Sequence, residues 1–284
     1  SVNGGTDVVI AATGQTTGTI SVGATAQASG SVNVAATGNY SDGADLTLGA
    51  ITVKGGTAAT VAVSTGITAA ETTAALTDTS NWTLTTNAVT VTGVAATTSA
   101  SVSQAVAVTE VDGLAESASV VMDTGGLVAN ETYTIAGLTL TASGTITDAA
   151  IASGFASLTA GATAGNVVAG GAWSGTLTGY STGTASTATV VFTSAVVGAV
   201  TDLAPTATGA TAAAATISQG ANGKLGVANG AISITDVNAA STTKAGSITT
   251  ATLENFGAAT VNSSALTDLV LKGKGTSVDA STSG

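Results

Sequence analysis

The feature that most constrains this chain is a set of short strand-like runs near its C-terminal end. Three of them, at 248–253, 259–261 and 266–271, follow one another at intervals of about a dozen residues or less. Each run alternates apolar and hydroxyl-bearing side chains, so that one face of a strand packs and the other meets water. Gly, Asn and Ser separate the runs, which is typical of stacked β-structure.

The same pattern covers most of the chain. Comparable runs occupy 8–10, 19–22, 31–34, 46–48, 51–53, 60–63, 82–84, 89–91 and 101–108, and they resume at 231–234. Gly and β-branched residues disfavour helices throughout, although a short helix over 68–76 is an alternative at that point. We therefore predict a mainly β ladder of stacked strands in two parts, 1–115 and 206–284.

The composition limits the kind of core that such a ladder can have. Hydrophobic residues make up 44% of the chain, but aromatic residues make up only 3%, and Ala and Val predominate. A wide core of bulky side chains is therefore not expected. A thin core of stacked Ala, Val, Ile, Leu and Thr fits better, because stacking gives every short strand a neighbour without bulk.

The sequence between 116 and 205 is richer in large side chains than the rest of the chain. This segment contains five of the eight aromatic residues: Tyr133, Phe155, Trp173, Tyr180 and Phe192. Strand-like runs at 120–122, 133–140, 173–177 and 187–193 have the pattern of an ordinary half-buried sheet. The concentration of large side chains predicts a compact core that belongs to this segment alone.

One good amphipathic helix is predicted within the same segment, over 147–158. Ile151, Phe155 and Leu158 are spaced so that they share one face of a helix. Thr147 is a suitable N-cap, and Asp148 favours the positive end of the helix dipole. We therefore predict a small α+β domain, 116–205, inserted into the β ladder.

Charge excludes several classes of partner. The chain has 16 Asp and Glu residues against five Lys and no Arg, and its net charge is −11. Nucleic acids and anionic lipids bind through Lys and Arg, so neither is an expected partner. No apolar run reaches transmembrane length, so we predict no membrane insertion. Carboxylates in so cation-poor a chain need counterions, and calcium binds to Asp, Asn and carbonyl oxygens.

The chain contains no His and no Cys. Disulfides, thiolate or imidazole metal sites, and Ser-His-Asp or Cys-His catalytic groups are therefore excluded. The catalytic alternative is a carboxylate pair of the glycosidase type, for which Asp42 and Asp45 are candidates, but both lie in a turn where solvation or an Asx-turn explains them. We predict that the protein is not an enzyme. A chain that lacks disulfides but is rich in Thr, Ser, Ala and Gly indicates a bacterial surface or secreted protein. The chain opens at Ser1 without Met, and we expect it to be a processed piece of a longer protein.

The segment 243–266, Thr-Lys-Ala-Gly-Ser-Ile-Thr-Thr-Ala-Thr-Leu-Glu-Asn-Phe-Gly-Ala-Ala-Thr-Val-Asn-Ser-Ser-Ala-Leu, resembles a known family. It is similar to the middle region of the calcium-dependent surface-layer proteins of Caulobacter and its proteobacterial relatives. The runs at 231–236 and 49–61 fit the same family, so the resemblance covers about two thirds of the chain and leaves out 116–205. It implies a parallel β-helix-like solenoid, secreted by a type I route, that tiles the cell exterior in a calcium-dependent lattice.

Calcium ligands are harder to assign, because the calcium-binding nonapeptide of secreted toxins, Gly-Gly-x-Gly-x-Asp, does not occur. Only Gly4-Gly5-Thr6-Asp7 is a fragment of it. The candidate ligands are acidic and amide side chains in turns or beside strand ends: Asp7, Asp42, Asp45, Asp112, Asp236, Asn238 and Asp268. Asp236 and Asn238 offer two oxygens on the same side of an extended segment. The alternative for every Asp is turn capping or simple solvation.

Three functions remain open. The first is a structural subunit that binds other copies of itself in an extracellular layer or filament on the bacterial surface, with calcium assisting assembly and cell-surface polysaccharide as a further partner. The second is a secreted adhesin passenger whose inserted domain binds a surface or glycan. The third is the shaft of a phage tail fibre, which predicts obligate trimers and which the resemblance disfavours.

Overall fold

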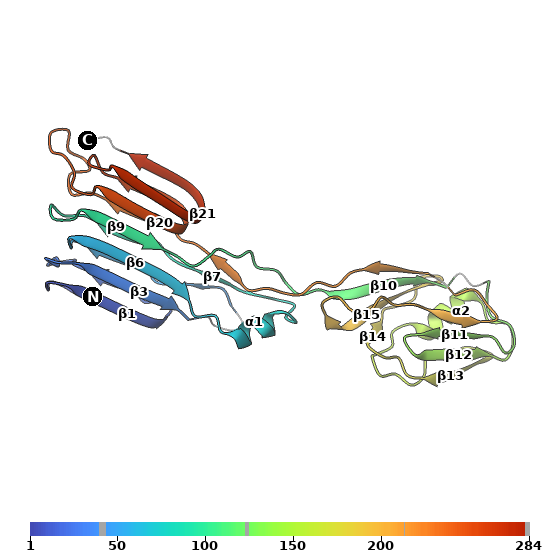
Figure 1. Ribbon diagram of the computed structural model, residues 1–284. Coiled ribbons are helices and arrows are strands. Elements are labelled where there is room, and N and C mark those ends of the chain that lie inside the picture. The colour runs from blue at the N-terminus through green and yellow to red at the C-terminus, as the bar shows by residue number, and fades with distance from the viewer. Residues whose placement is uncertain (40–43, 123–124, 213, 282–284) are drawn as a thin grey trace. The chain divides into compact units, whose positions relative to one another are not determined.

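A computed structural model describes residues 1–39, 44–122, 125–212 and 214–281, and the fold is mainly β (Figure 1). The chain forms two compact units. The first unit comprises residues 1–72, 81–111 and 224–284, and the second comprises 73–80 and 112–223. Helix α1 (Ala69–Ala75) lies where the chain passes from the first unit to the second, within the predicted 68–76.

The described residues of the first unit form thirteen strands. They are β1 (Val8–Gln15), β2 (Ile20–Val22), β3 (Val32–Gly38), β4 (Leu46–Thr47), β5 (Ile51–Lys54), β6 (Ala58–Thr65), β7 (Thr83–Thr85), β8 (Val89–Thr92), β9 (Ser99–Ser103), β18 (Gly226–Ala228), β19 (Ile232–Thr235), β20 (Thr250–Asn262) and β21 (Asp268–Ser281).

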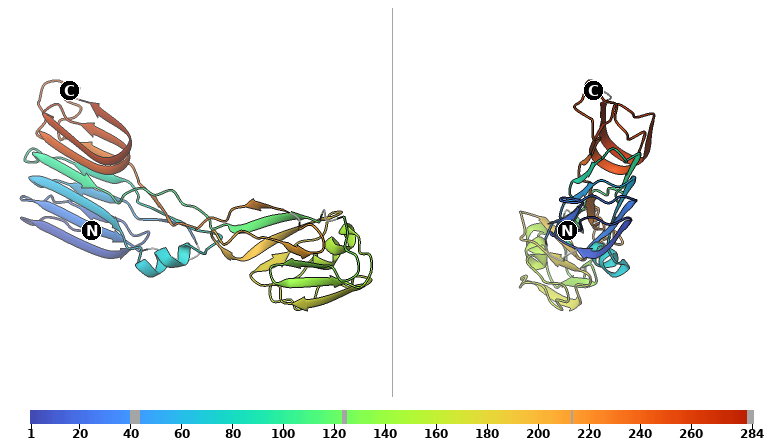
Figure 2. Two further views of the ribbon diagram at one scale, coloured as in Figure 1. Left: turned by 45° about the vertical axis from the view of Figure 1, so that its right-hand side comes forward. Right: turned by 90° about the vertical axis from the view of Figure 1, so that its left-hand side faces the viewer.

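Ten of these strands form one large curled parallel sheet, seen from two sides in Figure 2. Its order is β1-β3-β6-β9-β20-β19-β8-β5-β2, with β21 paired to β20. The first half of β20 pairs with β9 and its second half pairs with β19, so β20 joins two runs of stacked strands. Strands β18, β7 and β4 form a separate parallel sheet of three.

Aliphatic side chains at matched positions of these strands form buried rows. One row joins Val34, Val61, Val102 and Leu253 on β3, β6, β9 and β20. The other joins Val53, Val91, Ile234 and Val261 on β5, β8, β19 and β20. All eight side chains are 0% exposed. The alternation in the sequence therefore has the expected result: β-branched and Leu side chains face inward and hydroxyl-bearing side chains face outward.

The corner of β20 depends on Asn255. The pairing register with β21 shifts between Glu254 and Phe256, and Asn255 has a left-handed φ of 49°. Asn adopts this conformation more readily than most residues. Its side chain donates to the Gln104 carbonyl at 3.1 Å and accepts from the Lys274 backbone N–H at 3.1 Å. The predicted runs 248–253 and 259–261 are therefore one bent strand, because the turn between them keeps its hydrogen bonds.

In the second unit, the residues that the structure describes form two antiparallel sheets of four strands and a helix. One sheet has the order β14 (Tyr180–Thr182), β15 (Thr189–Val197), β10 (Ala115–Val121) and β17 (Ala215–Ser218). The other has the order β13 (Gly171–Gly175), β12 (Leu138–Ala142), β11 (Thr132–Ile135) and β16 (Thr206–Thr208). Helix α2 spans Asp148–Phe155, inside the predicted 147–158, and the predicted N-cap Thr147 accepts a hydrogen bond from the Ala150 N–H.

The core of the second unit is centred on Phe155. Its ring meets Trp173 edge-on at 4.9 Å between centroids, and Tyr133 and Phe192 lie at 6.3 and 6.2 Å. Tyr133, Phe155 and Phe192 are 0% exposed. Both sheets and α2 contribute to this one buried cluster. The aromatic residues that stand out in the sequence therefore pack together, as aromatic pairs do in ordinary cores.

Candidate functional site

The most elaborate polar site in the first unit surrounds Asp236, one of the predicted calcium ligands. The residue follows β19 and is 3% exposed. Its Oδ2 accepts hydrogen bonds from the N–H groups of Ser247 and Ile248, both at 2.7 Å, and from the Ser263 hydroxyl at 2.6 Å. Its Oδ1 accepts from the Val237 N–H at 2.6 Å and the Ser247 hydroxyl at 3.1 Å.

The pairing of β19 with β20 brings these groups together. Thr235 is opposite Asn262 in the ladder, so the next residues along each strand, Asp236 and Ser263, become neighbours. The Asp236 N–H extends the ladder by donating to the Asn262 carbonyl at 2.9 Å. A Cβ at Gly246 would lie 2.4 Å from Asp236 Oδ2, so this close approach requires glycine. The carboxylate thus connects the residues directly before and directly after β20 to the end of β19.

The pKa of the Asp236 carboxyl reflects two opposing effects. Burial raises the pKa, because it disfavours the charged form. The hydrogen bonds from Ser263, Ile248, Ser247 and Val237 favour the charged form, and together they leave the pKa below its ordinary value. The carboxylate is therefore held ionised by the fold.

This lowered pKa predicts a loss of stability in acid. A carboxyl whose folded pKa lies below its unfolded pKa contributes stability that is fully present above the unfolded value, about 3.9, and is lost as the pH falls through the folded value. We expect the free energy of unfolding of the first unit to fall below about pH 4, with Asp236 contributing up to about 1.4 kcal/mol per pH unit. Urea titrations at pH 7, 4 and 3 measure this.

The same titration is repeated on Asp236→Asn as the test variant and on Asp268→Asn as its control. The pH dependence should flatten in Asp236→Asn and remain in Asp268→Asn. Asp268 is exposed, and its carboxylate accepts a hydrogen bond from the neighbouring Thr267 hydroxyl at 3.0 Å. An unchanged pH dependence in Asp236→Asn would contradict the assignment of acid sensitivity to this carboxyl.

The other predicted ligands are dispersed over the described residues. Asp7 is exposed and accepts from the N–H and hydroxyl of Ser31 at 2.6 and 2.8 Å, bonds that lower its pKa. Asp45, also exposed, accepts from the Thr83 N–H at 2.8 Å. Each carboxylate thus accepts a hydrogen bond from the backbone of a segment that is distant in sequence and lies beside it.

The remaining predicted ligands show no shared centre either. Asn238 donates to the Ala245 carbonyl at 2.7 Å, and Asp112 is exposed at the start of the second unit. Asp42 lies outside the described residues. Across 1–39, 44–122, 125–212 and 214–281, no three or more His, Cys, Asp and Glu side chains lie close enough together to hold a metal ion.

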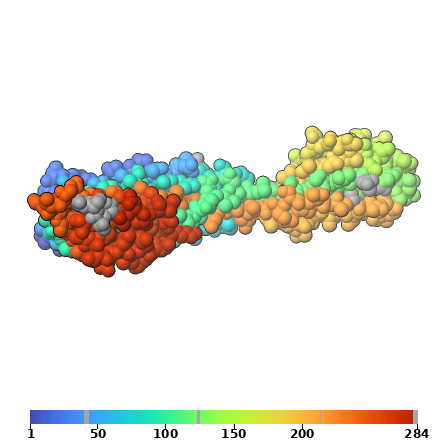
Figure 3. Space-filling view, turned by 90° about the horizontal axis from the view of Figure 1, so that it is seen from above, coloured from blue at the N-terminus to red at the C-terminus, as the bar shows by residue number. Residues whose placement is uncertain are grey.

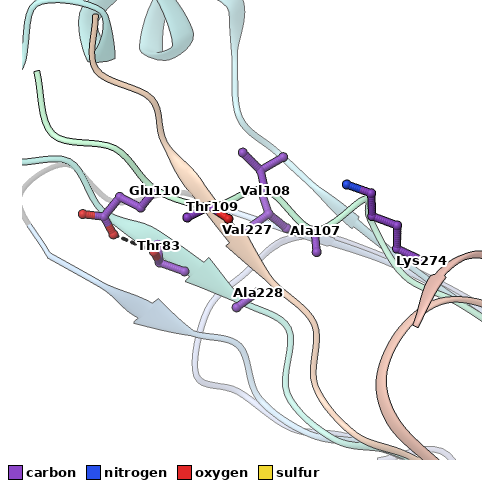
Figure 4. Close-up of a pocket in the computed structure, with 8 residues that line it drawn as sticks. All are labelled: Thr83, Ala107, Val108, Thr109, Glu110, Val227, Ala228 and Lys274. Carbon is purple, nitrogen blue, oxygen red and sulfur yellow. Dashed lines mark hydrogen bonds between the residues drawn. The ribbon is translucent and has the colours of Figure 1, made fainter. Parts of the chain in front are cut away.

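A shallow groove of about 570 Å³ opens in the first unit (Figure 4). It is lined by Thr83, Ala107, Val108, Thr109, Glu110, Val227, Ala228 and Lys274. Glu110 and Lys274 lie toward opposite ends, with Val and Ala side chains between them. The Thr83 hydroxyl donates to Glu110 Oε2 at 2.6 Å. The groove offers one carboxylate, one ammonium group and an apolar floor, which suits binding better than catalysis.

Sequence reasoning missed two carboxylates that the structure makes prominent, Glu110 in this groove and Glu116 in the second unit. Glu116 is 0% exposed on β10. A signal was present, because the alternation that turns Ala118 and Val120 inward also turns Glu116 inward. Glu110 has no comparable signal, because it lies outside the regular strands.

Comparison with known proteins does not assign the chain. No family model matches it, and a search of curated proteins finds no match. Among the described residues, no helix is both long enough and apolar enough to cross a membrane.

Proposed function

We propose that this protein is a non-catalytic structural subunit of a self-assembling extracellular layer or filament on a bacterial surface, with calcium assisting assembly. The observation that carries the proposal is that two strands of the parallel sheet, β1 and β21, each leave one side unpaired in the part of the chain that the structure describes. Within the described residues, β1 pairs only with β3, and β21 pairs only with β20. Unpaired edges present free N–H and C=O groups that another chain can bind.

The edges at β1 and β21 differ, and a strand of one kind can pair with a strand of the other. Strand β21 has 14 residues and is exposed along most of its length, and its residues reach the surface of the first unit in Figure 3. Strand β1 runs parallel to the rest of the sheet. A second copy could therefore place its β1 beside β21 and continue the parallel ladder. Such a head-to-tail contact uses two different surfaces and generates filaments or extended arrays.

We further propose that the curled sheet is a β-solenoid of the parallel β-helix type. Support comes from the pairing order, in which each strand pairs with its counterpart one turn later. In one row β1, β3, β6, β9 and β20 follow one another, and in the other β2, β5, β8, β19 and β20 do so. The resemblance of 243–266 to surface-layer proteins favours the same arrangement. Solenoids bury their core between turns and leave their end turns to be capped or paired.

Calcium is proposed as the bridging ion because of the charge balance. The net charge of −11 opposes close packing of copies unless cations neutralise it. The proposed bridging ligands are the exposed carboxylates of Asp7, Asp45, Asp112 and Asp268, and Asp42, Asp236 and Asn238 complete the proposed set. Extracellular calcium modules bind at roughly 10⁻⁴–10⁻³ M, which suits an environmental ion.

Negative-stain electron microscopy tests the proposal. The purified chain is imaged with millimolar calcium and then after addition of a chelator. We expect ordered sheets or filaments with calcium and dispersed particles after chelation, because bridged carboxylates repel one another once the ion is removed. Magnesium at the same concentration controls for simple charge screening. Dispersed particles under every condition would contradict self-assembly by this chain.

A second candidate function is a secreted adhesin passenger. The second unit favours it, because this unit has its own core of two sheets and a helix and could present a binding surface for cell-surface polysaccharide or another glycan. A full chain that stays dispersed with calcium but binds to immobilised polysaccharide would favour this function over assembly.

A further inference from the structure

The buried rows of the first unit are open at the β21 end. One row runs through the pairing registers from Ile10 on β1 to Leu271 on β21. Another runs from Ile20 on β2 to Val278 on β21. Leu271 is 50% exposed and Val278 is half-buried, and with Phe256 they contribute to the lining of a hollow of about 290 Å³. Apolar side chains at the end of stacked turns are normally covered by a further turn or a cap.

The opposite end of the stack is partly covered by residues 1–4, which we call the N-terminal segment. Val2 lies beside β2 in a parallel bridge. Its N–H donates to the Ser21 carbonyl at 2.8 Å, and its carbonyl accepts from the Gly23 N–H at 2.8 Å. The other side of β2 pairs with β5. The N-terminal segment therefore covers an edge of β2, whereas the corresponding edge of β1 stays unpaired among the described residues.

A second copy that joins β21 meets this segment. Strand β21 has two halves: residues 268–272 pair with the first half of β20, and residues 275–281 pair with its second half. The first half continues the row of strands that begins with β1, and the second half continues the row that begins with β2. When β1 of a second copy lies beside 268–272, β2 of that copy therefore lies beside 275–281. The N-terminal segment of that copy occupies the same edge of β2, and one edge cannot pair with two strands at once.

The N-terminal segment is held by few contacts. Besides its bridge to β2, the Thr25 N–H donates to Asn3 Oδ1 at 2.9 Å. None of its four side chains is buried, and Val2 is 37% exposed. Gly4 and Gly5, which connect the segment to the chain before β1, have left-handed φ angles of 75° and 99°. Glycine adopts several backbone conformations at little cost, so this connection allows the segment to turn away while β1 keeps its place.

We propose that the N-terminal segment is an exchangeable cap, and that the second half of β21 of a neighbouring copy displaces it from β2 during assembly. This inference rests on the proposed assembly function and names the contact through which copies join. The rows fix the register, with Val278 beside Ile20 facing the core and Asp279 opposite Ser21 on the outer face. The exchange replaces a single bridge with a longer parallel ladder and covers the hollow beside Phe256.

Deletion of residues 1–4 tests the exchange. The protein concentration needed for assembly in millimolar calcium should fall at least about tenfold, because two backbone hydrogen bonds no longer compete with the neighbouring copy. Val2→Pro, which removes the N–H that donates to Ser21, should lower this concentration severalfold. Val2→Thr keeps the N–H and is the matched control, expected to assemble like the wild type. Sedimentation velocity measures the concentration, and urea denaturation checks that each variant is folded.

Thiol cross-linking tests the register. The chain contains no Cys, so only introduced thiols react. A chain with Asp279→Cys is mixed with a chain with Ser21→Cys and oxidised in calcium, and we expect a disulfide-linked pair, because the two positions lie opposite each other in the joint. The control replaces the second chain with Asn33→Cys, an exposed position on β3 that the joint does not contact, and should give no linked pair.

The outcomes separate this inference from the proposed function. If the wild type assembles but the deletion leaves the required concentration unchanged or raises it, the exchange is wrong and the assembly function stands. If assembly occurs without linkage between Asp279→Cys and Ser21→Cys, the joint is wrong and the assembly function again stands. If neither the wild type nor the deletion variant assembles, the proposed function is wrong and the exchange with it. Assembly by the deletion variant alone would support both, since the cap then blocks joining in the wild type.

Discussion

Replacing Asp236 with alanine is expected to lower the free energy of unfolding of the first unit by about 3–5 kcal/mol, as for removal of one partner from a buried charged network. The substitution leaves the N–H groups of Ser247 and Ile248 without their acceptor, whereas the Ser263 hydroxyl can still donate to the Ile248 carbonyl at 2.8 Å. Each buried donor left unpaired costs about 1–3 kcal/mol, and partial relaxation keeps the total below the sum. The loss is large because one carboxylate satisfies groups from three segments.

Unfolding of the first unit can be followed separately from the second. Each unit contains one tryptophan, Trp82 in the first and Trp173 in the second. A Trp173→Phe background therefore leaves Trp82 fluorescence as a reporter of the first unit during urea denaturation. Asp268→Ala in the same background is the matched control, expected to change the free energy of unfolding by less than about 0.5 kcal/mol because its carboxylate is exposed.

The same measurement separates hydrogen bonding from calcium binding at Asp236. If the carboxylate acts through its hydrogen bonds, Asp236→Ala is destabilised equally with calcium and with a chelator. If it acts as a calcium ligand, the destabilisation appears only with calcium. A variant as stable as the control under both conditions would contradict either role.

Val9→Pro is expected to prevent assembly while leaving the first unit folded. The Val8 N–H donates to the Ser31 carbonyl at 2.9 Å, on the β3 side of β1. Successive N–H groups of a strand point to opposite sides, so the Val9 N–H faces the uncovered edge. Its side chain is 77% exposed. Proline there removes an edge donor and blocks approach of another strand, but it spares the ladder to β3.

The expected effects of Val9→Pro on assembly and stability are very different in size. We expect the protein concentration needed for assembly in millimolar calcium to rise at least about tenfold, since a lost hydrogen bond of about 1.4 kcal/mol corresponds to that factor. The free energy of unfolding should change by less than about 1 kcal/mol. Sedimentation velocity measures the concentration needed for assembly, and urea denaturation measures the free energy of unfolding.

Val9→Thr is the control for this variant, because it keeps the N–H and the extended conformation and should assemble like the wild type. Wild-type assembly by Val9→Pro would show that copies do not join through the β1 edge, and it would redirect attention to β21 or to the second unit.

Local features of the fold could be predicted from sequence with few errors of position. The alternation around Val34, Val61 and Val102 places these residues inward, and the structure buries all three. The helix over 147–158 and its N-cap Thr147 are also confirmed. Side-chain alternation, β-branching and capping act over a few neighbouring residues, so they can be recognised in one sequence.

The bend of β20 was missed for a physical reason. A run of Asn, Phe and Gly after Glu254 is typical of a break between strands, and it therefore predicts two separate runs, 248–253 and 259–261. The structure continues β20 through it, because Gln104 and Lys274, both far from Asn255 in sequence, satisfy the Asn255 side chain. A turn with distant partners cannot be recognised from its own residues.

The candidate sites likewise depend partly on local sequence and partly on contacts between distant segments. The sequence by itself determined a mainly β chain with a thin aliphatic core, few cations and no imidazole or thiol chemistry, because these follow from composition and from periodicity along a strand. Only the tertiary structure decided that Asp236 accepts from residues on both sides of β20, and that residues 1–4 cover an edge of β2. Both depend on which strands lie side by side and in which register, and a single sequence does not determine that choice.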